Sequence, residues 1–235
     1  IFLGGISRIA SFMEKVVPVM AALYLIGALI VLILNIGKLP SAVASIFIGA
    51  FCPRALAGSA AGMTVRMAMR YGVARGLFSN EAGMGSTPHA HAIADVKDPE
   101  EQGEVAMIGV FVDTFIVLNM TAFVIFVTNS IDGSTTGIAL TQKAFESGLG
   151  SFGITFVAIC LFFFAFSTVL SWNLFGKINA IWLFGKKNPK ACTVIYTLIA
   201  LVFILMGTMM SNDLVWELTD MFNNLMVIPN VIALF

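Results

Sequence analysis

The sequence predicts an all-α polytopic membrane protein, and its composition carries that prediction. Hydrophobic residues make up 59% of the 235 residues and charged residues 11%, with a mean hydropathy of +0.96. Soluble domains carry about 25% charged residues, so we expect apolar helices in a bilayer. The formal net charge is zero, which argues against a nucleic-acid-binding protein. The three cysteines lie too far apart to predict a disulfide framework or a metal site.

Runs with few or no charged residues predict the membrane spans. The run 16–37 carries no charge, and at 1.5 Å per residue it reaches roughly 33 Å, enough to cross the hydrocarbon core. The run 40–51 is too short to span, so we expect a helix lying against the outer face. We expect one transmembrane domain over 1–235, with spans at approximately 16–37, 56–94 (broken near 78–86), 105–128, 152–184, 191–212 and 214–235. Because the chain starts without a methionine and stops inside an apolar run, we expect a fragment of a longer protein.

Lysine and arginine residues predict the orientation, because cytoplasmic loops carry an excess of them. If the spans alternate, one side collects Arg8, Lys15, Lys97, Lys177, Lys186, Lys187 and Lys190. The other side collects Lys38, Asp132, Lys143, Glu146 and Asp213. We therefore expect the cytoplasmic face at the basic turn 185–190. This orientation requires the segment 55–96 to cross once, which places residues 78–83 near the middle of the membrane.

The stretch 75–86 interrupts the second predicted span with three glycines, three side chains that bear an amide or hydroxyl, and one carboxylate. Gly costs about 1 kcal/mol against Ala in a helix, and Ser or Asn compete for backbone hydrogen bonds. A break at bilayer depth is tolerated where it lines a cavity. Its free N–H groups suit a substrate carboxylate and its freed carbonyls a small cation, while Gly83 and Gly85 let a ligand approach the backbone. Ser79-Asn80 or Ser86-Thr87 could cap the second half-helix, with Pro88 in its first position. An ordinary helix-connecting loop is the alternative.

A second polar cluster lies at 166–172. Thr168 and Trp172 are four residues apart and share one helical face. Hydroxyl groups there could ligate sodium, and Trp172 could form the wall of a pocket. The alternative is structural, since membrane helices use Ser and Thr for packing and for hydrogen bonds to their own carbonyls.

The remaining ionisable residues inside the predicted spans have structural alternatives. Asp113 lies about nine residues into its span, and an intramembrane carboxylate is a functional candidate by default. We expect instead that Asp113 forms a structural pair with Arg66, Arg70 or Arg75, and Glu81 has the same two interpretations. His89 and His91 are two residues apart and point to different helical faces, which makes a poor metal pair. No nucleotide-binding, nucleophile or zinc motif appears, so we expect neither an enzyme nor a cofactor.

The stretch Gly76-Leu77-Phe78-Ser79-Asn80-Glu81-Ala82-Gly83-Met84-Gly85-Ser86 resembles the motif of the alanine or glycine:cation symporters, the sodium:alanine symporter family. The similarity continues through 109–114, 164–168 and 213–216 and covers essentially the whole chain. The chain departs from the family pattern at three places. It has Ser171-Trp172-Asn173-Leu174-Phe175 where the family commonly has Gly-Trp followed by a Ser or Asn and paired tyrosines. Lys177 stands where an acidic residue is usual, and 88–91 replaces a small, alanine-rich run.

The resemblance implies the five-plus-five inverted-repeat fold of the leucine-transporter type, with this chain holding the end of repeat one and most of repeat two. It implies substrate contacts from Phe78, Ser79, Asn80, Gly83, Thr168 and Trp172. It implies sodium ligands at Ser167 and Thr168. Gating or structural roles fall to Arg75, Glu81, Gly85 and Asp113.

The expected function is sodium-coupled symport of a small neutral amino acid, alanine or glycine, by alternating access across the prokaryotic plasma membrane. The partners are then the amino acid, sodium as coupling ion, and the lipid bilayer, and the sequence predicts no oligomeric state. One alternative is a proton-coupled amino-acid transporter with Asp113 or Glu81 as the proton carrier. Another is a non-transporting membrane scaffold or receptor subunit that keeps the fold.

Overall fold

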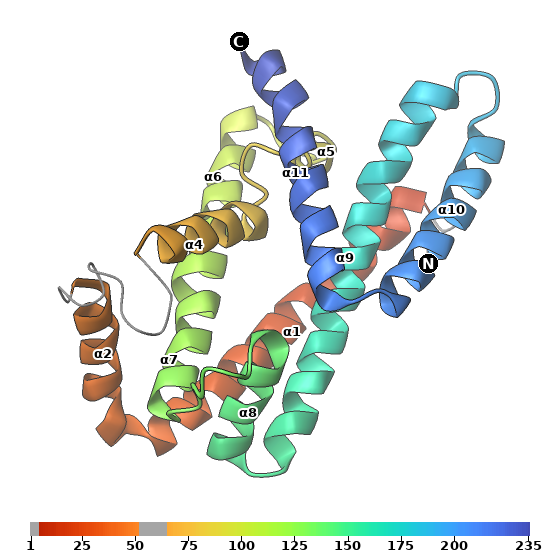
Figure 1. Ribbon diagram of the computed structural model, residues 1–235. Coiled ribbons are helices and arrows are strands. Elements are labelled where there is room, and N and C mark those ends of the chain that lie inside the picture. Colours follow the sequence, from red (N-terminus) through yellow and green to blue (C-terminus); the bar gives the residue numbers. More distant parts are fainter. Residues whose placement is uncertain (1–4, 52–64) are drawn as a thin grey trace. The chain divides into compact units, whose positions relative to one another are not determined.

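The structure, a computed structural model, describes residues 5–51 and 65–235, and over these residues it is helical without strands (Figure 1). The all-α prediction is confirmed for the described residues. The helices are α1 (Gly5–Leu34), α2 (Leu39–Phe51), α4 (Val65–Ser79), α5 (Pro88–His91), α6 (Pro99–Phe111), α7 (Asn119–Val127), α8 (Gly137–Leu149), α9 (Phe152–Phe184), α10 (Pro189–Met209) and α11 (Asn212–Leu234). A 3-10 helix occupies Ile36–Lys38, and a π-helix at Val112–Leu118 joins α6 to α7.

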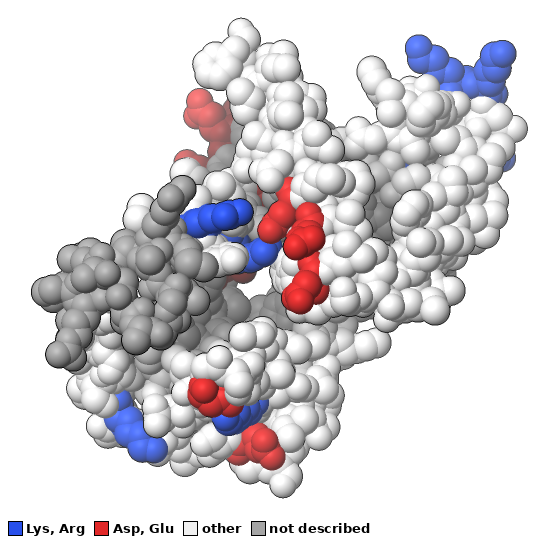
Figure 2. Space-filling view, in the orientation of Figure 1, with Lys and Arg blue, Asp and Glu red and all other residues white. Residues whose placement is uncertain are grey.

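Four helical stretches in the described part of the chain are long and apolar enough to cross a membrane: Ser11–Leu34, Pro99–Val127, Phe152–Phe184 and Pro189–Met209. Each meets the length of about 20 residues that a spanning helix needs. Most of the face shown in Figure 2 carries no charged side chain, as expected of surface in contact with lipid. α11 is not one of the four, and its first half carries Asp213, Glu217 and Asp220. The six expected spans therefore stay a prediction as a set.

The chain divides into two compact units. Unit 1 comprises 1–16, 81–104 and 165–235, and unit 2 comprises 17–80 and 105–164. The division falls between α4 and α5, because Asn80 belongs to unit 2 and Glu81 to unit 1.

Unit 2 has its core among α1, α7, α8 and α9. Val31 and Phe145 are fully buried there. The Phe145 ring packs against Tyr24 and Phe156, with centroid distances of 5.8 and 5.4 Å. The Tyr24 hydroxyl shares a hydrogen bond of 2.6 Å with Thr121 Oγ1, so the phenol has a partner in an apolar setting. These contacts fix α1 against α7 and α8.

The π-helix in unit 2 positions two polar residues. Its wider turns leave some carbonyls poorly matched, and such segments are frequent at functional sites. Asn119 Nδ2 donates to the carbonyls of Thr114 and Phe115, at 3.2 and 3.1 Å. This side chain therefore satisfies two of the carbonyls in the segment that carries Asp113 and Thr114.

Unit 1 packs the start of α1 against α9. Ile9, Leu170 and Leu174 are buried together, and the rings of Phe12 and Phe166 meet edge to face at 5.8 Å. At 100° per residue, the stripe through Leu170 and Leu174 faces away from Trp172, Phe175 and Asn179. One side of α9 thus forms the core and the opposite side carries polar and aromatic groups.

Candidate functional site

The candidate site is centred on the interruption between α4 and α5. α4 ends at Ser79, and helix resumes at Pro88. Three alternate residues between them have positive φ, with Glu81 at 51°, Gly83 at 74° and Gly85 at 73°. A right-handed helix cannot pass through this conformation, which costs a residue with a side chain roughly 1–2 kcal/mol. The two glycines adopt it readily.

The upstream side of the break is held by the π-helix of unit 2. Ser79 Oγ donates to Asp113 Oδ2 at 2.5 Å. Asn80 and Thr114 exchange hydrogen bonds through their side chains at 3.0 and 3.2 Å, and Asn80 Nδ2 also donates to the carbonyl of Gly76 at 3.0 Å. The last turn of α4 is therefore fixed to the segment that carries Asp113.

The predicted pairing of Asp113 with an arginine is wrong for Arg70 and Arg75, the two candidate arginines whose side chains the structure describes. The Asp113 carboxylate accepts from the Ser79 hydroxyl, and neither Arg70 nor Arg75 pairs with it. The side chain of Arg66 lies outside the described residues. The π-helix brings Asp113 beside the end of α4, where the Ser79 hydroxyl donates to one of its carboxylate oxygens.

The downstream side of the break is organised by Glu81 in unit 1. Ser86 Oγ and Thr87 Oγ1 both donate to Glu81 Oε2, at 2.6 and 3.2 Å. Thr87 occupies the N-cap position of α5, yet its side chain makes no capping bond. The capping expected from Ser86-Thr87 is thus replaced by a contact with Glu81. Since α5 has only four residues, its dipole adds little at the break.

Asn230 of α11 closes over the break. Its Nδ2 donates to the carbonyl of Gly83 at 3.0 Å. A Cβ added at Gly85 would lie 2.7 Å from Asn230 Oδ1, so a side chain there would displace the asparagine. The position of a Cβ at Gly83 has no atom within 4 Å. The backbone is therefore covered at Gly85 and open at Gly83.

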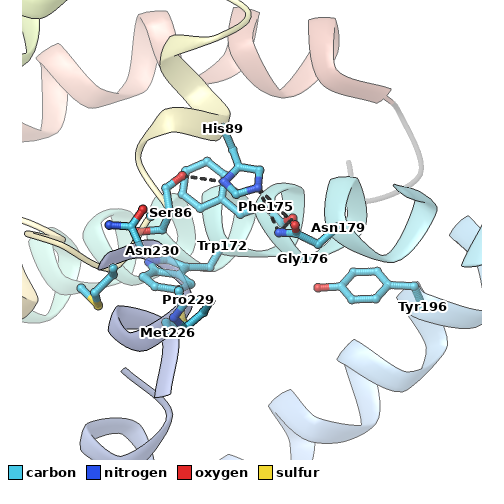
Figure 3. A pocket seen from close by; sticks show the side chains of 12 residues that line it. Ser86, His89, Trp172, Phe175, Gly176, Asn179, Tyr196, Met226, Pro229 and Asn230 are labelled. Atoms are coloured by element: carbon cyan, nitrogen blue, oxygen red, sulfur yellow. Dashed lines mark hydrogen bonds between the residues drawn. The ribbon is translucent and has the colours of Figure 1, made fainter. Parts of the chain in front are cut away.

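A pocket of about 510 Å³ lies beside the downstream side of the break and is formed entirely within unit 1 (Figure 3). The break, α5, α9, α10 and α11 all contribute to it. Its polar lining comes from Ser86, His89, Asn179, Tyr196 and Asn230, and its aromatic walls include Trp172 and Phe175. This volume falls in the range of sites for small organic molecules.

His89 links the break to α9. Its Nδ1 lies 2.9 Å from the carbonyl oxygen of Ser86, and because a carbonyl can only accept, Nδ1 must carry the hydrogen. Its Nε2 lies 3.1 Å from Asn179 Nδ2 and 3.3 Å from Asn179 Oδ1, and in the neutral ring Nε2 accepts from the amide nitrogen. The imidazole also packs against the ring of Phe175 with a centroid distance of 5.8 Å. Figure 3 shows these contacts on one side of the pocket.

Gly176 allows α10 to approach α9 at the pocket. A Cβ at Gly176 would lie 2.0 Å from the Tyr196 hydroxyl oxygen. The phenol therefore occupies space that any other residue at position 176 would fill. In Figure 3 the Tyr196 hydroxyl points toward Gly176.

The predicted site residues fall into two groups. Unit 1 holds Glu81, Gly83, Gly85, Ser167, Thr168 and Trp172, and unit 2 holds Arg75, Phe78, Ser79, Asn80 and Asp113. Trp172 lines the pocket, Ser167 is buried, and Thr168 is exposed. Their roles toward substrate and sodium stay predictions.

Sequence reasoning missed four polar residues of the pocket: His89, Asn179, Tyr196 and Asn230. His89 was considered only as a metal ligand with His91, which instead accepts a contact from Gln102. Asn230 lies 147 positions from Gly83, and no local pattern joins them. The available signal was polarity itself, since amides inside apolar runs of a membrane protein favour functional or packing roles.

Comparison with known proteins identifies the family of the chain. The sodium:alanine symporter family matches residues 1–235. The chain is 42% identical over its full length to an uncharacterized transporter of Haemophilus influenzae, covering 51% of that protein. It is 37% identical to the putative sodium/proton-dependent alanine carrier YrbD of Bacillus subtilis and 38% identical to the sodium/alanine symporter AgcS of Methanococcus maripaludis, covering 50% and 51% of them. The chain thus spans about half the length of the curated relatives it matches. It belongs to the sodium:alanine symporter family of multi-pass membrane transporters.

Proposed function

We propose that the whole protein containing this chain is a sodium-coupled symporter of small neutral amino acids, alanine or glycine, that works by alternating access. The observation that carries the proposal is the interrupted helix at 80–87, with two left-handed glycines and an open backbone at Gly83. Secondary transporters build substrate sites from such discontinuous helices. Family membership and the names of AgcS and YrbD support alanine as the substrate.

The break offers donors suited to a carboxylate. The backbone N–H groups of Gly83 and Gly85 donate to no group in the described part of the chain. Because these residues lack side chains, a small ligand can reach the backbone directly. We assign substrate contacts to Phe78, Ser79, Asn80, Gly83, Thr168 and Trp172, with Trp172 as an apolar wall. Glu81 and Gly85 shape the break, and Arg75 and Asp113 support α4.

Sodium is assigned to the hydroxyl groups of α9. Ser167 and Thr168 offer neutral oxygen ligands, which suit a hard monovalent cation. Coupling arises because sodium and substrate stabilise the same closed state, so each raises the affinity for the other by the same factor. The membrane potential contributes about 2.3 kcal/mol per charge per 100 mV.

We further propose the leucine-transporter-type architecture of five plus five inverted repeats, in the plasma membrane of a prokaryote. The chain supplies the end of repeat one and most of repeat two. This share of the fold is consistent with the length of the chain, which covers about half the length of its relatives.

The test is uptake of labelled alanine by proteoliposomes containing the whole protein. An inward sodium gradient should drive accumulation above the equilibrium level, and an equal potassium gradient should not. Equal uptake under both gradients would refute sodium coupling. Gly83→Val, with Gly207→Ala as a control for a glycine in open surroundings on α10, should abolish the sodium-driven component.

A second candidate is proton coupling, favoured by one observation. In the described part of the chain the carboxylates on both sides of the break, Asp113 and Glu81, accept hydrogen bonds from hydroxyls. Uptake driven by a pH gradient without sodium, and lost in Asp113→Asn or Glu81→Gln, would favour this candidate over sodium.

A further inference from the structure

A second pocket, of about 420 Å³, lies between α9 and α10 next to the turn that joins them. On α10 its lining includes Ala191, Ile195 and Ile199, which recur every four residues and therefore share one helical face. On α9 it includes Ala180 and Phe184, also four residues apart. From Ala191 to Ile199 the lining extends roughly 12 Å along α10. We call this apolar pocket the hairpin groove.

Lysine side chains lie at the end of the hairpin groove next to the turn. Lys187 lines the groove, and Lys186 and Lys190 flank it in the sequence. All three are exposed, and in the described part of the chain none of them forms an ion pair. No Asp or Glu occurs between Glu146 and Asp213. Figure 2 shows a basic cluster without an acidic neighbour where Figure 1 draws the turn between α9 and α10. The hairpin of α9 and α10 therefore does not neutralise the charge of its own turn.

Asn188 adds a neutral hydrogen-bond donor beside Lys187. Its Oδ1 accepts from the Ala191 amide at 3.1 Å and caps α10. This bond fixes the orientation of the side-chain amide, because a backbone N–H can only donate. Its Nδ2 donates to no group among the residues that the structure describes. The groove end thus presents an ammonium group and an amide nitrogen, both of them donors, and phosphate oxygens are the acceptors that such donors bind strongly.

Aromatic and apolar residues indicate the depth of the groove in the membrane. Trp182, two residues before the end of α9, is 74% exposed, and Trp is enriched where the membrane meets water. The apolar lining continues from this level along α10, which is long and apolar enough to cross a membrane. A cationic end at the depth of the headgroups and an apolar channel at the depth of the acyl chains match the two parts of an anionic phospholipid.

We propose that the hairpin groove binds an anionic phospholipid of the leaflet on the side of the basic turn. Its phosphate is held by Lys187 and Asn188, and one acyl chain lies between α9 and α10. Charge selects this occupant, since basic pockets between membrane helices on the cytoplasmic side bind anionic headgroups. A second copy fits poorly, because a two-fold contact through the groove would bring two basic turns together. The site requires neither sodium coupling nor a particular transported solute.

The test measures binding of labelled dioleoylphosphatidylglycerol to the delipidated whole protein in a non-ionic detergent. Binding should be saturable. Dioleoylphosphatidylcholine has the same acyl chains without net charge and should compete about tenfold more weakly, because each lysine near an anionic headgroup adds to the attraction. Glycerol 3-phosphate has the phosphate without acyl chains and should not displace the lipid.

Two variants test the two parts of the site. Lys187→Gln should weaken phosphatidylglycerol binding about fivefold, and Lys187→Arg should retain it. Ala191→Phe fills the groove without changing charge and should weaken both phospholipids. Both positions are exposed, so neither change removes core packing. Lys97→Gln and Val194→Phe, at exposed positions outside the groove, are the matched controls and should bind normally.

Equal competition by phosphatidylcholine, displacement by glycerol 3-phosphate, or unchanged binding in both Lys187→Gln and Ala191→Phe would overturn the proposed lipid site. Absence of saturable binding would also overturn it, and would assign the groove to a contact within the whole protein or with a second copy. Sodium-driven alanine uptake is a separate measurement. Its failure with phosphatidylglycerol binding intact would reject the proposed function alone.

Discussion

Replacing Gly85 by alanine should destabilise the break through two separable effects. The residue has φ of 73°, and holding an L-residue in this region costs roughly 1–2 kcal/mol. The new Cβ would lie 2.7 Å from Asn230 Oδ1 and 3.0 Å from its Cγ. Asn230 must therefore move and lose its bond to the carbonyl of Gly83, which contributes about 1 kcal/mol. The expected total is roughly 2–3 kcal/mol.

Gly83 provides the matched control, because only the first effect applies there. Its φ is 74°, almost the same, but its Cβ position is empty. Gly83→Ala should then cost only roughly 1–2 kcal/mol, about 1 kcal/mol less than Gly85→Ala. Gly85→Ala already breaks the bond from Asn230, so the double variant Gly85→Ala/Asn230→Ala should cost about as much as Gly85→Ala alone and less than the sum of the two single variants.

The assay is the free energy of unfolding of the whole protein, measured by titration of SDS into mixed micelles for the two single variants, Asn230→Ala and the double variant. Hydrogen exchange of the segment 80–91 shows whether the loss is local to the break. Equal losses in Gly83→Ala and Gly85→Ala, or additivity of Gly85→Ala with Asn230→Ala, would refute the contact as described.

Three further predictions follow from other contacts. Gly83→Val and Trp172→Ala should each strongly weaken alanine binding measured by equilibrium dialysis, and unchanged affinity in both would remove them from the substrate site. Gly176→Ala should displace the Tyr196 hydroxyl, which the new Cβ would approach to 2.0 Å; the thermal midpoint should fall and Gly176→Ala/Tyr196→Phe should partly restore it, whereas Gly207→Ala should leave it unchanged. In the loop before α8, Asp132 accepts from Lys143 Nζ at 2.8 Å and from the amides of Ser134 and Thr135. Its pKa is lowered, first by Lys143 and then by Thr135, so its stabilising effect is complete above the ordinary Asp pKa and is lost only as pH falls through the lower folded value. Hydrogen-exchange protection of the Ser134 and Thr135 amides should therefore stay constant from pH 8 to pH 5 after correction for intrinsic rates. Asp132→Ala should lose more of this protection than Asp132→Asn. Protection that weakens well above pH 4 would contradict this.

Local composition indicated the position of the break, because its causes are local. Glycine and short polar side chains disfavour helix wherever they cluster, and the stretch 75–86 contains both. The structure ends α4 at Ser79 and begins α5 at Pro88. The brevity of α5 was not foreseen, since the expected second half-helix extended to residue 94.

Contacts across long sequence separations could not be predicted from one sequence. The bond from Asn230 to Gly83 joins positions 147 apart, and that from Ser79 to Asp113 joins positions 34 apart. Charge alone suggested an arginine as the partner of Asp113. The partner of Asp113 depends instead on the π-helix at 112–118, which sets the direction of the Asp113 side chain. Composition does not predict a π-helix.

The pocket residues were missed for a related reason. Polar residues in an apolar run indicate that something unusual happens there, but the face they occupy depends on the register of several helices. His89 was judged against His91 by metal geometry, whereas its partners are the Ser86 carbonyl and Asn179. Only three-dimensional packing brings a residue of α5 beside α9.

The most direct test of sodium-coupled recognition is the affinity of the whole protein for alanine, measured by isothermal titration in potassium buffer with and without sodium. Because the two ligands stabilise one state, sodium should tighten alanine binding, alanine should tighten sodium binding by the same factor, and Gly83→Val should abolish both effects. An alanine affinity that is the same with and without sodium would contradict the proposed function.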